Sequence, residues 1–364
     1  FPLTNTAVTG AIGNASPGYF SDAGPFPEGV IFRNDILRTD EQLGVFGEAT
    51  FDFNDQFAVT LGARWYDIEV DLEGSANSSF SNLGASTDAQ AFGTNISAQF
   101  AANNTVGAPD KAATDGVIYK LTGTWTPNSD LLFYATYSEG FRPGLLNRPG
   151  GRTNPAGNYT VPFAVDTDEV QNYELGWKTE LFDNSLRFNG SAFFVEIEGL
   201  QTTIFDPSIV NLFFSDNAAN AEIQGLEGDF TWAPYSVDGL TIAGAFSLLD
   251  TEVTDVLVPT NDVVLGSDLA FAPAWQGNLR ARYEWDLERQ IDGQTLTAHI
   301  MPQVVFSDDS VSDIIEINKA DVDGYVTLGG TLGVTADQWS AEIYATNLTN
   351  EYAELSNNFV FDRE

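Results

Sequence analysis

Among its 364 residues the chain contains no cysteine, one histidine and one methionine. Without cysteine it forms no disulfide. It carries only 15 lysine and arginine residues against 52 aspartate and glutamate residues, a formal net charge of -37. This deficit of cations argues against nucleic acid as a partner, because nucleic-acid affinity comes mainly from cationic contacts to phosphates. It also argues against electrostatic docking on an anionic lipid surface.

Long apolar runs are also missing. No stretch of about 18 apolar residues occurs, which excludes a transmembrane helix. If the chain crosses a membrane, it must therefore cross it with strands. The chain starts at Phe1 without a methionine, a basic segment or an apolar signal segment. We therefore expect that processing or truncation removed a preceding segment.

No catalytic constellation is visible in the sequence. It has no glycine-rich phosphate loop leading into a helix, and no Ser, His and Asp set that stands out from chance. We therefore expect no enzyme activity, no cofactor and no metal site. His299 falls on the polar side of its segment and is interpreted as a hydrogen-bonded residue. The neighbouring acids Asp308 and Asp309 are interpreted as part of a solvated loop.

What the sequence does contain is strict alternation of apolar and polar residues over long segments. The clearest example is the hairpin from Asp166 to Leu200, whose arms meet at Asp183 and Asn184. Strands in soluble globular proteins are usually about 5 to 6 residues long. Two-faced strands of ten or more residues, joined by short turns, are typical of a sheet that faces lipid on one side and water on the other.

The same unit repeats along the chain and predicts 12 strands. Short turns alternate with long loops, as in bacterial outer-membrane barrels. We therefore predict an all-β fold, a transmembrane antiparallel up-and-down β-barrel. Residues 1–40 are predicted to be a loop, and residues 41–364 the barrel portion, a single domain. Pro302 lacks a ladder donor and predicts a local irregularity. The predicted short turns are 54–55, 127–130, 183–184, 234–239, 288–294 and 335–338.

Aromatic and charged residues support the two-faced interpretation. Tryptophan and tyrosine favour the membrane interface, and the tryptophans fall toward the ends of the predicted strands. The predicted aromatic girdle consists of Trp65, Trp125, Trp232, Trp275, Trp285 and Trp339. The opposite, lumen-facing rows include Arg64, Glu174, Lys178, Arg187, Arg280 and Arg282, for which cross-strand salt bridges are the simplest role.

Four stretches resemble the C-terminal part of the barrel of TonB-dependent outer-membrane receptors. They occur in the order and at the spacing of that family, and the resemblance covers roughly residues 41–355. The stretches are YATYSEGFRPG (Tyr134 to Gly144), NYELGWKTEL (Asn172 to Leu181), GLEGDFTWAP (Gly225 to Pro234) and NLTNEYA (Asn347 to Ala353).

The chain departs from the family at both ends. In the family a final strand closes on an aromatic residue, whereas this chain ends FVFDRE. The family's N-terminal plug domain and energy-coupling box have no counterpart here. We therefore expect an incomplete chain, with its 12 strands corresponding to the tenth to twenty-first of a barrel of about 22 strands.

The resemblance implies a receptor in the outer membrane of a Gram-negative bacterium. Its implied function is energy-coupled uptake of a scarce nutrient, such as a ferric siderophore, cobalamin or an oligosaccharide. Implied partners are this small molecule, outer-membrane lipid and lipopolysaccharide, and an inner-membrane TonB-type complex that pulls on the plug. Two alternatives stay open: a passive porin, and a structural or adhesive barrel that displays its long loops.

One loop departs from the acidic balance of the chain. Arg142, Arg148 and Arg152 fall within eleven residues without an intervening acid. Our hypothesis is that this loop contacts an anionic ligand or a lipopolysaccharide phosphate. The alternative is that these arginines pair with neighbouring acidic loops.

Overall fold

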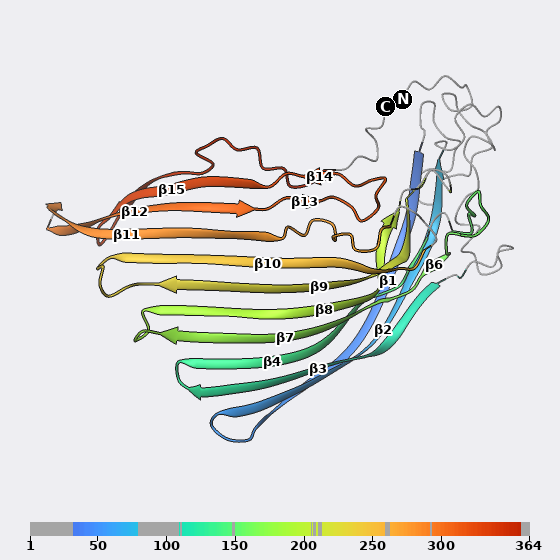
Figure 1. The fold of residues 1–364 in the computed structure, drawn as a ribbon, viewed down its shortest axis with the longest axis horizontal. Helices are drawn as coiled ribbons and strands as arrows, with labels where there is room; N and C mark the ends of the chain where they lie inside the picture. The colour runs from blue at the N-terminus through green and yellow to red at the C-terminus, as the bar shows by residue number, and fades with distance from the viewer. Residues whose placement is uncertain are drawn as a thin grey trace.

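Twelve long strands form one antiparallel sheet in the part of the chain that the structure describes (Figure 1). The structure is a computed structural model, and it describes residues 32–78, 109, 111–147, 150–204, 206, 209, 213–258, 263–291 and 293–357. Each long strand pairs with the next one along the chain. The strands are β1 (Phe32–Asp52), β2 (Phe57–Ser78), β3 (Lys111–Asn128), β4 (Leu131–Arg142), β7 (Asp168–Leu181), β8 (Leu186–Ile204), β9 (Phe214–Trp232), β10 (Leu240–Val256), β11 (Trp275–Ile291), β12 (Gln294–Ser307), β15 (Tyr325–Thr335) and β16 (Ser340–Ala345).

The predicted number of long strands and their meander order are confirmed. Two further two-stranded sheets lie within the long connections, where only loops were predicted. One pairs β5 (Leu145–Leu146) with β6 (Ala164–Val165), and the other pairs β13 (Ser310–Val311) with β14 (Asp321–Val322).

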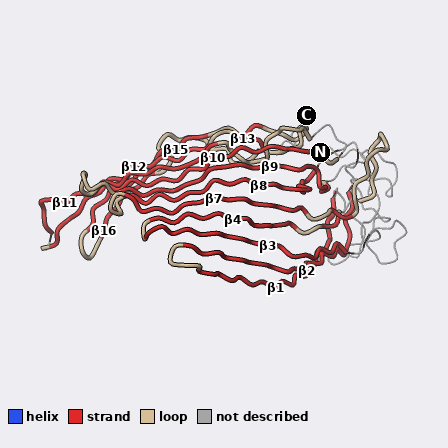
Figure 2. The backbone as a smooth tube through the Cα atoms, turned by 60° about the horizontal axis from the view of Figure 1, so that its bottom comes forward, coloured by secondary structure: helices blue, strands red, loops and turns tan. Residues whose placement is uncertain are grey.

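Short and long connections lie at opposite ends of the sheet (Figures 1 and 2). Every second connection is short, as predicted, and the others contain the long loops. In outer-membrane barrels the short turns face the periplasm and the long loops face outward. The short connections span residues 53–56, 129–130, 182–185, 233–239, 292–293 and 336–339.

The predicted loop of residues 1–40 needs a correction at its end. Strand β1 begins at Phe32, and residues 1–31 lie outside the described residues. β1 and β2 are 21 and 22 residues long, whereas about 9 to 11 residues cross a bilayer. The first part of β1, residues 32–42, pairs with β2 through the backbone but has no apolar alternation of its own. A search for that alternation therefore places the start of β1 too late.

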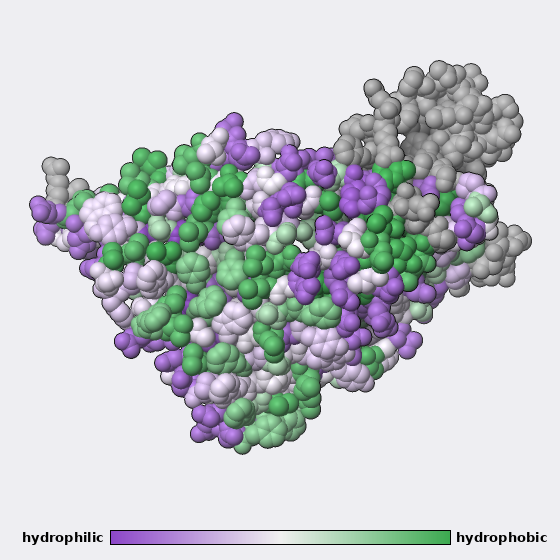
Figure 3. Space-filling model, viewed as in Figure 1, coloured by the Kyte–Doolittle hydropathy of each residue, from purple (hydrophilic) through white to green (hydrophobic). Residues whose placement is uncertain are grey.

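Both clusters of buried apolar side chains lie at the long-loop end, whereas Leu296, Ala298 and Ala336 are buried singly near short turns. The larger cluster brings the tips of β8, β9 and β10 together with the loops around Val161, Val263 and Ile315. A smaller cluster joins Val70 and Ala112 to Leu146 of β5. Within the described ranges, no helix is long and apolar enough to cross a membrane. Figure 3 shows apolar side chains spread over the strands, with hydrophilic ones at the turn tips.

Candidate functional site

One face of the sheet carries two rows of aromatic side chains. Near the short turns, the ring of Trp125 stacks between those of Phe57 and Phe133, with centroid distances of 6.1 and 5.5 Å. Near the long loops, the ring centroids of Trp275 and Phe306 are 4.4 Å apart. The predicted girdle residues Trp65, Trp125, Trp232, Trp275, Trp285 and Trp339 are all exposed, as lipid-facing side chains are in the absence of lipid.

The spacing of these rows fits a bilayer. Trp275 opens β11 and Trp285 lies ten residues further along it. With a rise of about 3.3 Å per residue and a strand tilt of about 40°, their separation along the membrane normal is about 25 Å. An outer-membrane barrel has an apolar band of about this height. This supports the predicted girdle.

The opposite face carries the charged rows. Lys120 Nζ lies 3.5 Å from Glu48 Oε2, and Arg282 Nη2 lies 2.6 Å from Glu284 Oε1. Glu174 accepts a hydrogen bond of 2.5 Å from the Tyr134 hydroxyl. Four of the predicted lumen cations make no ion pair in the described part of the chain, so cross-strand pairing is not their role here. They are Arg64, Lys178, Arg187 and Arg280.

His299 lies on this charged face and is almost completely buried. Its imidazole lies over Gly333 of β15, where an added Cβ would be 2.4 Å from His299 Cε1. Nε2 is 3.1 Å from Glu342 Oε1 of β16, although the angles at this contact are not those of a hydrogen bond. The contacts of His299 therefore connect three strands: β12, which carries it, β15 and β16. Across the described residues, no group of three or more His, Asp or Glu side chains is arranged to hold a metal ion.

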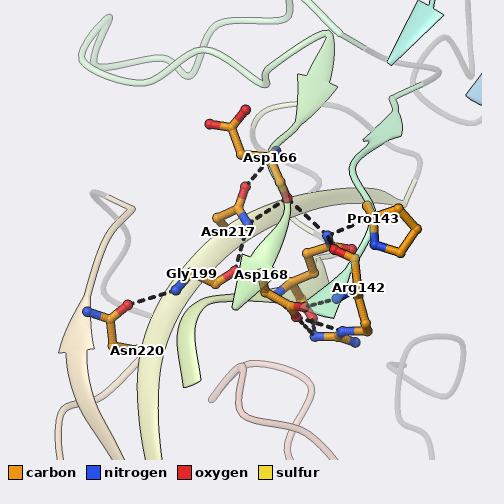
Figure 4. A network of polar contacts seen from close by, with 8 residues as sticks. Arg142, Pro143, Asp166, Asp168, Gly199, Asn217 and Asn220 are labelled. Carbon is orange, nitrogen blue, oxygen red and sulfur yellow. Dashed lines mark hydrogen bonds and ion pairs between the residues drawn. The ribbon is translucent and has the colours of Figure 1, made fainter. Parts of the chain in front are cut away.

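The predicted arginine loop begins with a residue that is already paired. Asp168, at the start of β7, is buried and accepts hydrogen bonds from the Arg142 backbone N–H at 2.8 Å and from Nε at 2.6 Å (Figure 4). Arg142 Nη2 also donates to the Gln201 carbonyl at 3.0 Å, and Gln201 Nε2 donates to the Asp166 carbonyl at 3.0 Å. This network joins the ends of β4, β7 and β8.

The other two arginines are placed differently. Arg148 lies outside the described residues. Arg152 is exposed, on a hairpin closed by the pair Thr153 and Thr160, and the structure records no ion pair for its guanidinium among the described residues. The structure therefore does not bring the described arginines into one cluster, and Arg152 is the candidate that carries an available charge.

Two residues that sequence reasoning missed hold this hairpin against the sheet. Buried Asn147 donates to the Pro162 and Ser215 carbonyls at 2.9 and 2.6 Å and accepts from the Ser215 N–H at 2.8 Å. The Tyr159 hydroxyl donates to Asp216 at 2.5 Å. Burial, followed by this hydrogen bond, raises the pKa of Tyr159 above its usual value. No local sequence pattern predicts the contacts to Ser215 and Asp216, because these partners are more than 50 residues away.

The remaining described long loops pack against the hairpin around Val161 and the strand tips. Val263 forms an isolated β-bridge with Ile315, and both are buried with Val161 of the hairpin. The described loops are thus tied to one another and to the strand tips. The outward end of the sheet is a packed platform, not a set of independent loops.

A comparison with known families identifies this architecture. A family model described as TonB dependent receptor-like, beta-barrel, matches residues 4–348. The chain belongs to this TonB-dependent receptor family. The resemblance predicted from the sequence, the β-barrel fold class and the location in the outer membrane of Gram-negative bacteria are confirmed.

Two relatives of this TonB-dependent receptor chain are named as a metal-pseudopaline receptor and a probable siderophore receptor. The metal-pseudopaline receptor CntO of Pseudomonas aeruginosa is 30% identical over 162 residues, 44% of this chain and 21% of that protein. The probable TonB-dependent siderophore receptor PiuA of Acinetobacter baumannii is 24% identical over 230 residues, 63% of this chain and 26% of that protein. The chain thus spans about a quarter of these relatives.

Solved structures agree on the fold. The ferric yersiniabactin uptake receptor FyuA of Yersinia pestis has a TM-score of 0.64 at 16% identity, covering 92% of this chain and 44% of that one. The siderophore receptor PiuA of Acinetobacter baumannii has a TM-score of 0.58 at 19% identity, covering 91% of this chain and 40% of that one. The aligned sheet is therefore less than half of each solved chain.

Proposed function

We propose that this chain forms part of the barrel wall of a receptor that imports a scarce nutrient with energy supplied from the inner membrane. Membership in the TonB-dependent receptor family is the observation that carries the proposal. The lumen face supports it. Arg64, Lys178, Arg187 and Arg280 have no ion-pair partner within the described wall, so a plug can supply one. In this function the plug takes the pull of a TonB-type complex, and the chain has no enzyme activity.

The nutrient we favour is a ferric siderophore or a related metal complex, ahead of cobalamin or an oligosaccharide. The names of the two curated relatives support this choice. On this chain, the exposed Arg152 is the cation best placed to meet an anionic ligand on the outward platform or a lipopolysaccharide phosphate. Arg142 has a structural role instead, because its guanidinium is bound to Asp168.

Two alternatives make different predictions. A passive porin passes small solutes down their gradient without an energy source. A structural or adhesive barrel passes none. Membership in the TonB-dependent receptor family favours the importer over the porin. Lipid and lipopolysaccharide surround the wall in all three cases, and none involves nucleic acid.

The test is an uptake assay in a Gram-negative host that lacks its own siderophore receptors. The complete receptor is expressed with and without the host's TonB-type complex, and accumulation of radioactive iron is followed for a panel of ferric siderophores. We expect accumulation of at least one complex only when the energy-transducing complex is present. Accumulation that is independent of this complex favours the porin, and no accumulation of any complex contradicts the metal-complex assignment. Arg152→Gln should weaken binding of the transported complex, with Arg152→Lys as the charge-preserving control.

A further inference from the structure

The face of the sheet that carries the aromatic rows contains a groove at the short-turn end. There the hairpins β1–β2 and β3–β4 lie side by side (Figure 1). The registers define two neighbouring rows there. The row nearer the turns is entirely aromatic: Phe57, Trp125, Phe133 and Trp177. The next row pairs large residues with small ones: Val59, Gly123, Ala135 and Leu175.

The small residues in the second row create the groove. Gly123 and Ala135 place only a hydrogen atom and a methyl group between the larger Val59 and Leu175. An added Cβ at Gly123 would have no atom within 4 Å. The resulting cavity has a volume of about 660 Å³ and is lined almost entirely by apolar side chains, including Phe53 and the stacked pair Phe57 and Trp125.

The turnward end of the groove is polar. Asn54 lines it, and its Oδ1 accepts the backbone N–H groups of Gln56 and Phe57 at 2.9 and 3.0 Å. These bonds fix the orientation of the Asn54 amide and leave its N–H groups without a partner in the described residues. Gln56 Nε2 donates to the Pro127 carbonyl at 2.9 Å, which joins this turn to the next one.

The charged residues on the two joined turns, 53–56 and 129–130, are all acidic. Asp55 and Asp130 are exposed, and the structure records no ion pair for either of them among the described residues. The cations nearest the groove on the strands that line it are Lys120 of β3 and Lys178 of β7. Both belong to the lumen face, and Lys120 is paired with Glu48. A headgroup at this position therefore meets carboxylates and an amide donor, with no cation to hold an uncompensated phosphate.

We propose that this groove is a binding site for a phospholipid with an ethanolamine headgroup. One acyl chain lies over Gly123 and Ala135 against the aromatic row. The phosphate accepts the free Asn54 amide N–H, and the headgroup ammonium lies between Asp55 and Asp130. The short turns of such a barrel face the periplasm, so the site opens to the inner leaflet, which is composed of phospholipid. An anionic phosphatidylglycerol fits the same groove but is repelled by both carboxylates.

The test is native mass spectrometry of the complete receptor, with phosphatidylethanolamine and phosphatidylglycerol that carry identical acyl chains. We expect the ethanolamine lipid to bind up to about fivefold more tightly, the effect of one exposed ion pair. Gly123→Leu fills the groove without a local clash and should weaken both lipids about tenfold, since several methylene contacts are lost. Gly47→Leu is the matched control: it also adds a leucine to the outward face where a Cβ meets nothing within 4 Å, and it should change neither lipid.

The headgroup assignment is tested separately. Asp55→Lys should make phosphatidylglycerol the more tightly bound lipid. The affinities of the two lipids taken together should stay similar. Tighter binding of phosphatidylglycerol to the unaltered receptor would overturn the proposal. So would an unchanged affinity in Gly123→Leu, or an unchanged preference in Asp55→Lys. Retained iron uptake in all three variants keeps a failure of this site distinct from a failure of the transport function.

Discussion

Arg142 and Asp168 lock the end of β4 to the start of β7. The Asp168 carboxylate is 1% exposed and binds both the backbone N–H and the guanidinium of Arg142. The two residues are direct partners in the β4–β7 register. Arg142 then reaches the Gln201 carbonyl on β8. A single buried carboxylate thereby joins three strand ends beside the platform of outer loops.

The two members of this pair should not be equally costly to remove. Arg142→Ala leaves a buried carboxylate without its counter-ion, whereas Asp168→Asn leaves a half-exposed guanidinium that water can solvate. We expect local losses of about 2 kcal/mol and about 1 kcal/mol respectively. Hydrogen exchange of the amides of residues 142 and 201 measures these opening free energies. The double variant should lose less than the sum, and strict additivity would contradict the coupling.

Asn147 should control whether the outer hairpin stays docked. Asn147→Leu keeps the size of the side chain but leaves the Pro162 carbonyl and both backbone groups of Ser215 without their partners. Each buried unsatisfied group costs about 1 to 3 kcal/mol, so we expect the hairpin to open readily. Limited proteolysis of residues 150–161 measures the release. Asn278→Leu, at an exposed position of β11 where the side chain makes no hydrogen bond to the described residues, is the control and should leave cleavage unchanged.

Asp313 provides a pH test of the loop between β13 and β14. Burial raises the pKa of this carboxyl, against the effects of backbone donors and Lys319. A raised pKa means that the protonated form is favoured in the folded loop. Its stabilising contribution is full below the unfolded value of about 3.8 and is lost as the pH rises through the folded value.

Asp313→Asn should therefore stabilise the loop at pH 7. Asparagine imitates the protonated form, and its Oδ1 still accepts the Ile315 N–H, now at 2.9 Å from Asp313 Oδ1. Hydrogen exchange across residues 308–324 should slow in the variant at pH 7, and the difference should vanish below about pH 3.8. A stabilisation that persists at low pH would show that burial of the charge is not its cause.

The sequence predicts the wall better than the mouth, for a physical reason. Wall residues such as Trp125 and Lys120 are assigned to a face by their immediate neighbours, because side chains alternate along a strand. The effect of Pro302 is also set by its own position in the strand. On the β11 side the ladder leaves Met301 and Pro302 unpaired without a change of register, so the irregularity is a gap and not a bulge, while the pairing with β15 is continuous.

The platform is different because its contacts are distant in sequence. Asn147 binds Ser215 across 68 residues, and Arg142 reaches Gln201 across 59. Asn147 lies outside the long strands and Arg142 is the last residue of β4, so no period indicates the partner of either one. The arginine spacing suggested a shared role for Arg142 and Arg152, yet spacing carries no information about the buried Asp168, which binds only one of them.

Gly333 should be essential for attaching the edge strand β16. The His299 ring occupies the space above it, and a Cβ there would lie 2.4 Å from His299 Cε1 and 2.8 Å from Glu342 Cγ. Gly333→Ala should therefore displace the ring from Glu342 at a cost of about 1 to 3 kcal/mol. Faster exchange of the β16 amides and a shift in Trp339 fluorescence would report the loosened strand. Gly47→Ala, with open space around it, is the control. Adding His299→Ser to Gly333→Ala removes the closer clash and leaves only the contact with Glu342, so it should recover part of the loss. A double variant as loose as Gly333→Ala alone would mean that the glycine is not required by the histidine.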